Sequence, residues 1–73
     1  MPKRNAECWA KAGRAMWRLA QANANLANDN LDASAPYYNK PAIDRLPAEQ
    51  NEVNDATASL ANQIKECVGL KQP

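Results

Sequence analysis

Cys8 and Cys67 are the residues of this 73-residue chain whose chemistry depends most on how the chain folds. Two thiols can form a disulfide, and with further ligands they can contribute to a metal site. The sequence has no histidine, so a metal site would need carboxylates or a second chain to complete its ligands. We therefore expect no metal and no cofactor, and the pair is either a structural disulfide, two buried thiols or a redox switch.

The acidic residues of the second half do not indicate catalysis. Glu49, Glu52 and Asp55 fall where the first turns of a helix are expected, on its solvent face, and acids there stabilise the helix dipole. The chain also lacks a paired nucleophile and base and a glycine-rich phosphate loop. We expect a protein that is not an enzyme.

Two helices are expected to position the cysteines. Residues 4–31 are rich in alanine and contain neither proline nor β-branched residues, which is typical of a helix, with Gly13 as its weak point. Spacing at 100° per residue gathers one apolar stripe: Cys8, Ala12, Ala15, Leu19 and Leu26.

A connector is predicted over residues 32–46, because this segment holds Pro36, Pro41 and several other turn-forming residues. Tyr37, Tyr38 and Ile43 are expected to cover the open end of the structure. Pro47 fits the first turn of a second helix over residues 47–69. The apolar stripe of this helix is Val53, Ala56, Leu60, Ile64 and Cys67.

The two cysteines meet only if the helices run antiparallel, so the sequence predicts an all-α fold, a single-domain helical hairpin spanning residues 1–73. With Cys8 opposite Cys67, Ala15 faces Leu60 and Leu19 faces Ala56, so that large side chains meet small ones. Asn23 falls near Val53, where its amide either fixes the register or reaches water.

The apolar surface of the first helix is wider than a two-helix hairpin needs. The residues expected to form a further interface are Trp9, Gly13, Met16, Trp17, Ala20 and Ala24. Tryptophan is enriched at binding hot spots, and small side chains let a second helix approach closely. The interface predicts a homodimer of two hairpins in a four-helix arrangement, or a different protein partner.

Charge is divided between the two parts of the chain. Residues 1–27 hold five basic residues and one acid, a net charge of +4, whereas residues 28–66 hold three basic residues and seven acids, a net charge of −4. The total is only +1, which does not favour a nucleic-acid binder, although Lys11, Arg14 and Arg18 form a basic row. No apolar run is long enough to span a bilayer, so we expect no membrane contact and a cytoplasmic location.

These features predict a non-enzymatic protein-binding module. Its concrete form is a small accessory regulator or inhibitor, of the kind that phages and mobile elements encode, which binds a larger protein through Trp9, Arg14 and Trp17 and blocks or redirects it. Two alternatives remain open. One is a small nucleic-acid-binding accessory protein that uses the basic row, and the other is a structural assembly subunit.

Overall fold

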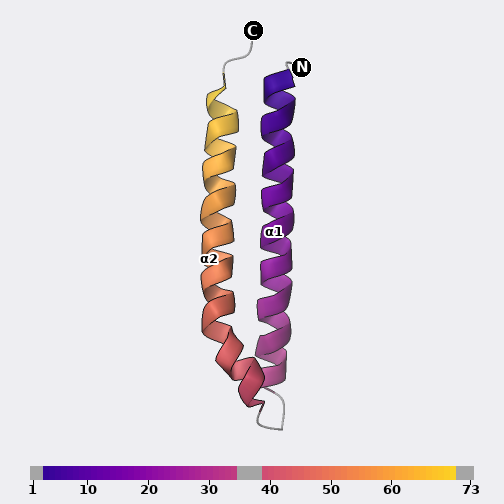
Figure 1. The fold of residues 1–73 in the computed structure, drawn as a ribbon, viewed down its shortest axis with the longest axis vertical. Helices are drawn as coiled ribbons and strands as arrows, with labels where there is room; N and C mark the ends of the chain where they lie inside the picture. Colours follow the sequence, from indigo (N-terminus) through magenta and orange to yellow (C-terminus); the bar gives the residue numbers. More distant parts are fainter. Residues whose placement is uncertain (1–2, 35–38, 71–73) are drawn as a thin grey trace.

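Two long antiparallel helices, α1 (Lys3–Ala33) and α2 (Lys40–Gly69), form the molecule in the computed structural model, which describes residues 3–34 and 39–70. They lie side by side in a rod with extents of 59 × 15 × 12 Å, and the start of α1 lies beside the end of α2 (Figure 1). The predicted all-α helical hairpin is confirmed.

The contact between the helices follows a seven-residue repeat. In an antiparallel pair of helices, a seam with steps of three and four residues keeps each helix facing its partner. The buried and half-buried residues of α1 have this spacing throughout: Asn5, Cys8, Ala12, Ala15, Leu19, Ala22, Leu26, Asp29 and Ala33. The same spacing in α2 and the residue after it gives the other side of the seam: Ala42, Leu46, Glu49, Val53, Ala56, Leu60, Gln63, Cys67 and Leu70.

A disulfide between Cys8 and Cys67 sets the register of this seam, with a Cα–Cα distance of 5.6 Å. Counting from the disulfide along both helices places Leu19 opposite Ala56, as the sequence predicted, and Ala22 opposite Val53. Asn23 is exposed, so the idea that its amide is buried and fixes the register is wrong.

The core is built from small side chains. Its buried apolar residues are Ala12, Ala22, Ala42, Ala56 and Cys67. Leucine and valine on one helix meet alanine on the other, so the backbones approach closely, but each layer removes little apolar area from water. A hairpin with such a core needs support from its covalent link and from its polar contacts.

The second helix begins earlier than predicted. It starts at Lys40 rather than at residue 47, and α1 continues to Ala33, so the connector expected over residues 32–46 is too long. Asn39 caps α2, because its side-chain Oδ1 accepts a hydrogen bond of 3.1 Å from the backbone N of Ala42. Pro41 occupies the first turn, which is the role expected for Pro47.

Pro47 therefore lies inside α2, where it has no N–H to donate to the carbonyl one turn earlier. The first turns of α2, before Pro47, lean toward α1 (Figure 1). The helix has no acid in its first turn, so the dipole role expected for Glu49, Glu52 and Asp55 is wrong. Ile43 is half-buried, and Tyr37 and Tyr38 lie outside the described residues.

Candidate interaction surface

The largest apolar side chains of the described residues lie outside the core. Trp9 is 41% exposed, Met16 is 59% exposed, Trp17 is 68% exposed and Leu31 is 71% exposed. On α2, Ile64 and Val68 are also exposed. The hairpin thus buries alanine and leaves tryptophan in contact with solvent, which is the reverse of an ordinary small core.

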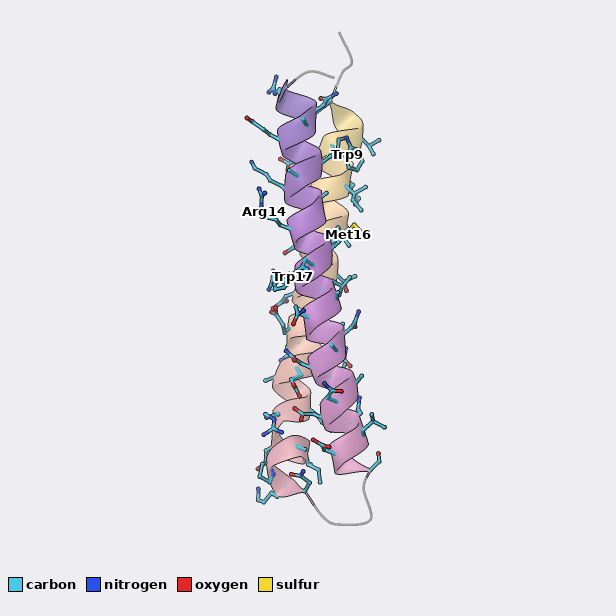
Figure 2. All side chains as sticks on the ribbon, turned by 90° about the vertical axis from the view of Figure 1, so that its right-hand side faces the viewer. Trp9, Arg14, Met16 and Trp17 are labelled. Carbon is cyan, nitrogen blue, oxygen red and sulfur yellow. A yellow bond between two sulfur atoms is a disulfide. The ribbon has the colours of Figure 1, made fainter. Side chains whose placement is uncertain are left out.

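Trp9 and Trp17 lie on different sides of the hairpin. Figure 2 shows Trp9 and Met16 on one side of α1, whereas Arg14 and Trp17 point to the other side. The binding surface expected from Trp9, Arg14 and Trp17 together is therefore divided in two. The reason is the seam: Trp9 and Met16 each follow a seam residue directly, whereas Trp17 lies near the middle of the outer face.

The first of these surfaces, which we call the Trp9–Met16 face, extends onto α2. Ile64 follows the seam residue Gln63 as Trp9 follows Cys8, so the antiparallel register places both on the same side of the seam. A shallow groove of about 200 Å³ lies between the helices on this side. It is lined by Met16, Leu19, Ala20, Asn23 and Leu60.

The second surface, the outer face of α1, has its own seven-residue repeat. Its positions step by four and three residues along the helix, they are all apolar or glycine, and every one is exposed: Ala6, Ala10, Gly13, Trp17, Ala20, Ala24, Ala27 and Leu31. This is the spacing by which a helix contacts another helix. Within α1 and α2 no element covers it, because α2 lies on the seam.

The predicted basic row is partly neutralised within the hairpin. Arg18 donates hydrogen bonds to Glu52 from Nε at 2.9 Å and from Nη2 at 2.7 Å, and from Nη1 to the Ser59 hydroxyl at 3.3 Å. The hydrogen bonds and opposite charge of Glu52 raise the pKa of Arg18, and Arg18 lowers the pKa of Glu52. Arg18 therefore joins the helices, while Lys11 lines a separate cavity.

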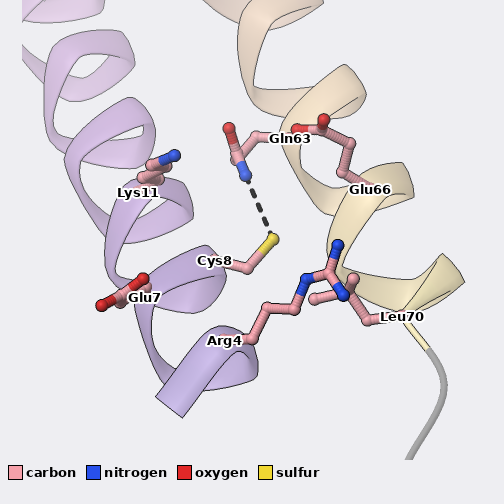
Figure 3. A pocket seen from close by; sticks show the side chains of 7 residues that line it. All are labelled: Arg4, Glu7, Cys8, Lys11, Gln63, Glu66 and Leu70. Atoms are coloured by element: carbon pink, nitrogen blue, oxygen red, sulfur yellow. Dashed lines mark hydrogen bonds between the residues drawn. The ribbon is translucent and has the colours of Figure 1, made fainter.

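That cavity lies beside the disulfide, at the end of the rod where the helices start and finish. It is lined by Arg4, Glu7, Cys8, Lys11, Gln63, Glu66 and Leu70 (Figure 3). The amide Nε2 of Gln63 lies 3.2 Å from Cys8 Sγ and 3.7 Å from Cys67 Sγ, so it donates to both sulfurs. The mixture of acids and bases around the opening favours neither an anion nor a cation.

At the opposite end, sequence reasoning missed a cluster of charged residues in the seam. Asp29 is 7% exposed and accepts two hydrogen bonds from Arg45, each 2.8 Å long. These bonds lower the pKa of Asp29 to about 2 and raise the pKa of Arg45. Position 29 belongs to the seven-residue repeat of the seam, so this spacing is the feature of the sequence that could have identified Asp29 as a seam residue.

Glu49 belongs to the same cluster. Its Oε1 is buried and has no hydrogen-bond partner among the described residues. Hydrogen bonding with Asp29, burial and the repulsion of the Asp29 charge raise the pKa of Glu49, because all three favour the protonated acid. A protonated Glu49 can donate the hydrogen bond that two carboxylates cannot form.

A second polar group in the seam is Asn5, which is buried while its Nδ2 has no partner among the described residues. The buried amide of the seam is thus Asn5 rather than Asn23. An amide in a helical seam costs stability and restricts which registers are acceptable.

Two further features concern residues 3–34 and 39–70 only. They contain no group of three or more histidine, cysteine, aspartate or glutamate side chains placed to hold a metal ion. Neither α1 nor α2 contains a stretch apolar enough to cross a lipid bilayer.

Comparisons of the chain with protein-family models, with curated proteins and with solved structures gave no match. The two apolar surfaces and the polar groups of the seam are therefore the features from which a function can be argued.

Proposed function

We propose that this chain is a non-enzymatic protein-binding module, a small accessory regulator that binds a larger protein and blocks or redirects it. The observation that carries the proposal is the reversed distribution of apolar side chains, with alanine in the core and Trp9, Met16 and Trp17 exposed. Exposed apolar patches of this kind mark interaction sites, and tryptophan supplies much of the binding energy where it is buried by a partner.

The Trp9–Met16 face is the surface on which we expect the larger protein to bind. It combines two large exposed side chains of α1 with the groove that reaches Leu60 of α2. A groove between two helices accepts an apolar side chain from a partner helix or loop. An exposed apolar surface without a groove would not provide a binding position for that side chain.

The test compares two substitutions that introduce the same charge. Met16→Glu places a carboxylate on the Trp9–Met16 face, and the control Ala58→Glu places one on an exposed position of α2 away from the groove. A protein captured by the wild-type chain is identified and purified, and then titrated calorimetrically with all three chains. We expect Met16→Glu to weaken binding at least tenfold and Ala58→Glu to have no effect. Equal binding by the two variants would contradict the proposed face.

Nucleic-acid binding through Lys11, Arg14 and Arg18 is a less favourable alternative. A phosphate would have to compete with Glu52 for Arg18, and the electrostatic attraction would be reduced accordingly. A role as a structural assembly subunit also stays a proposal, supported by the second apolar surface on the outer face of α1.

The expected cytoplasmic location and the resemblance in size to phage accessory proteins remain proposals. The Cys8–Cys67 disulfide favours an oxidising compartment over the cytoplasm, because disulfides persist in oxidising compartments and are rare in a reducing cytosol. We likewise propose the homodimer expected from the sequence.

A further inference from the structure

The cavity beside the disulfide makes one of the two bonded cysteines more accessible than the other. Cys8 is half-buried and lines the cavity, whereas Cys67 is only 3% exposed and does not line it. A disulfide is cleaved when a thiolate attacks one of its sulfurs, and access is one factor that decides which sulfur is attacked. A thiolate that enters from solvent therefore reaches the Cys8 side of the bond.

The charged residues around Cys8 suit a molecule that carries charges of both signs. Arg4 and Lys11 contribute cations to the cavity, and Glu7 and Glu66 contribute carboxylates (Figure 3). Each of these four residues directly precedes a residue of the seam, so all of them lie on one side of it. In the part of the chain that the structure describes, none of them belongs to an ion pair. Their charges thus remain available to a bound molecule.

We propose that Cys8 is a site of reversible thiolation by a small zwitterionic thiol, a molecule with the size and charges of free cysteine. The carboxylate of this thiol lies against Lys11 and Arg4, and its ammonium lies against Glu7 and Glu66. The cavity has a volume of about 220 Å³, which equals the space of about seven water molecules and accommodates a molecule as small as an amino acid.

The exchange keeps the number of disulfide bonds constant. The thiolate of the entering molecule bonds to Cys8 Sγ, the bond between Cys8 Sγ and Cys67 Sγ breaks, and its electron pair leaves with Cys67 as a thiolate. The amide Nε2 of Gln63, which lies 3.7 Å from Cys67 Sγ, donates a hydrogen bond to this leaving sulfur, and water then supplies a proton. In the reverse step, Cys67 attacks the mixed disulfide, expels the small thiol and restores the link between the helices.

The thiolation site is separate from the surface on which we expect the larger protein to bind. The charged residues of the cavity precede seam residues, whereas Trp9 and Met16 follow them, so the cavity and the Trp9–Met16 face lie on opposite sides of the seam. Thiolation therefore does not rest on the function proposed above. It opens one end of the rod, while the hydrogen bonds between Arg45 and Asp29 hold the helices together at the other end.

Peptide mass spectrometry determines which sulfur is attacked. The oxidised chain is treated with free cysteine, newly formed thiols are alkylated at the earliest time points, and the peptides that carry each group are identified. We expect the free cysteine on Cys8 and the alkyl group on Cys67. Adducts mainly on Cys67, or in equal amounts on both residues, would overturn the proposal.

Related thiols test the need for both charges. Cysteamine has the thiol and the ammonium of cysteine without its carboxylate, mercaptopropionate has the thiol and a carboxylate without the ammonium, and mercaptoethanol has neither charge. The measured quantity is the rate constant of disulfide opening by each thiol, divided by the rate constant for mercaptoethanol on the same chain variant. Because mercaptoethanol carries only the charge of its attacking sulfur, this ratio isolates the effect of the ammonium and the carboxylate.

Two substitutions in the cavity should change this ratio in different ways. Lys11→Gln should lower it about threefold, the effect of one exposed ion pair, for cysteine and mercaptopropionate but not for cysteamine. Glu7→Gln should lower it by a similar factor for cysteine and cysteamine but not for mercaptopropionate. The control Lys65→Gln, at an exposed position of α2 outside the cavity, should leave every ratio unchanged.

Circular dichroism checks that all of these variants stay helical. A ratio for cysteine that either cavity substitution leaves unchanged, or that Lys65→Gln lowers as much as Lys11→Gln does, would overturn the proposal. None of these outcomes would alter the binding expected at the Trp9–Met16 face.

Discussion

Arg45 of α2 holds the carboxylate of Asp29 in α1 through two hydrogen bonds of 2.8 Å, inside a seam that is otherwise mostly apolar. Paired hydrogen bonds between a guanidinium and a carboxylate are directional as well as strong. They fix the helices relative to each other at the end of the rod opposite the disulfide. Glu49 lies in the same cluster with a buried oxygen that has no partner among the described residues.

The stability of the hairpin should depend on pH through Asp29 and Glu49 in opposite directions. The pKa of Asp29 is lowered to about 2 by its hydrogen bonds with Arg45, so its contribution is present above its unfolded pKa and is lost as the pH falls toward 2. The pKa of Glu49 is raised, chiefly by the hydrogen bond that its protonated form can donate to Asp29, so its contribution is lost as the pH rises through that raised pKa.

We therefore expect thermal unfolding to show a maximum in Tm at mildly acidic pH, with a decline toward neutral pH. Asp32 also acts on Arg45 electrostatically, but the decline requires Glu49. Glu49→Gln should abolish the decline above the ordinary pKa of a glutamate, and the control Glu66→Gln should preserve it. A decline that persists in Glu49→Gln would contradict the assignment.

Removing the disulfide should be one of the most destabilising changes available. Cys8 and Cys67 are 59 residues apart in sequence, and the loop-entropy relation gives about 4 kcal/mol for a link of that length. We expect the Cys8→Ala, Cys67→Ala double variant to lose a stability of this order in urea unfolding. Reductant should have the same effect on the wild-type chain and none on the double variant.

Replacing Pro47 should stabilise α2. Alanine at this position restores a donor for the carbonyl of Ile43, and a proline inside a helix costs up to about 3 kcal/mol relative to alanine. We expect Pro47→Ala to raise both the helical signal and the urea midpoint. Pro41→Ala provides the matched control, because proline in the first turn of a helix costs little stability. An equal gain in stability for both variants would contradict the cost assigned to Pro47.

Gly13→Ala should stabilise α1 by about 1 kcal/mol, the difference in helix propensity between the two residues. A Cβ built at Gly13 has nothing within 4 Å, so the hairpin itself offers no steric resistance. The measurement is urea unfolding at a concentration where the chain is monomeric. A loss of stability under those conditions would contradict the open surroundings of Gly13.

The fold was predictable because Cys8 and Cys67 allow only one direction for the second helix, and the large and small residues between them agree with one register. The start of α2 was not predictable, because Pro41 and Pro47 both suit the first turn of a helix. The hydrogen bond from the backbone N of Ala42 to Asn39 distinguishes them, and this contact is known only from the structure. Asp29 and Glu49 were missed because a carboxylate is ordinarily expected in solvent.

The candidate surface was only partly predictable for a different reason. The sequence identifies Trp9 and Trp17 as surplus to a two-helix core, and both are exposed. Their separation onto two sides follows from their positions relative to the seam, because Trp9 directly follows the seam residue Cys8 whereas Trp17 lies near the middle of the outer face. The seam itself depends on which faces of the two helices meet, and the composition of α1 alone does not fix this.

The disulfide also makes residues 8–67 a covalent ring. A pulling force applied to the two ends of the chain would pass from Cys8 to Cys67 through the sulfur atoms, and the helices between them would carry none of it. In the oxidised chain, the hairpin would transmit tension as a short rigid link, whereas the reduced chain would extend by the length of the whole ring. Reduction would thus increase the distance to which groups attached to the two ends of the chain can be pulled apart.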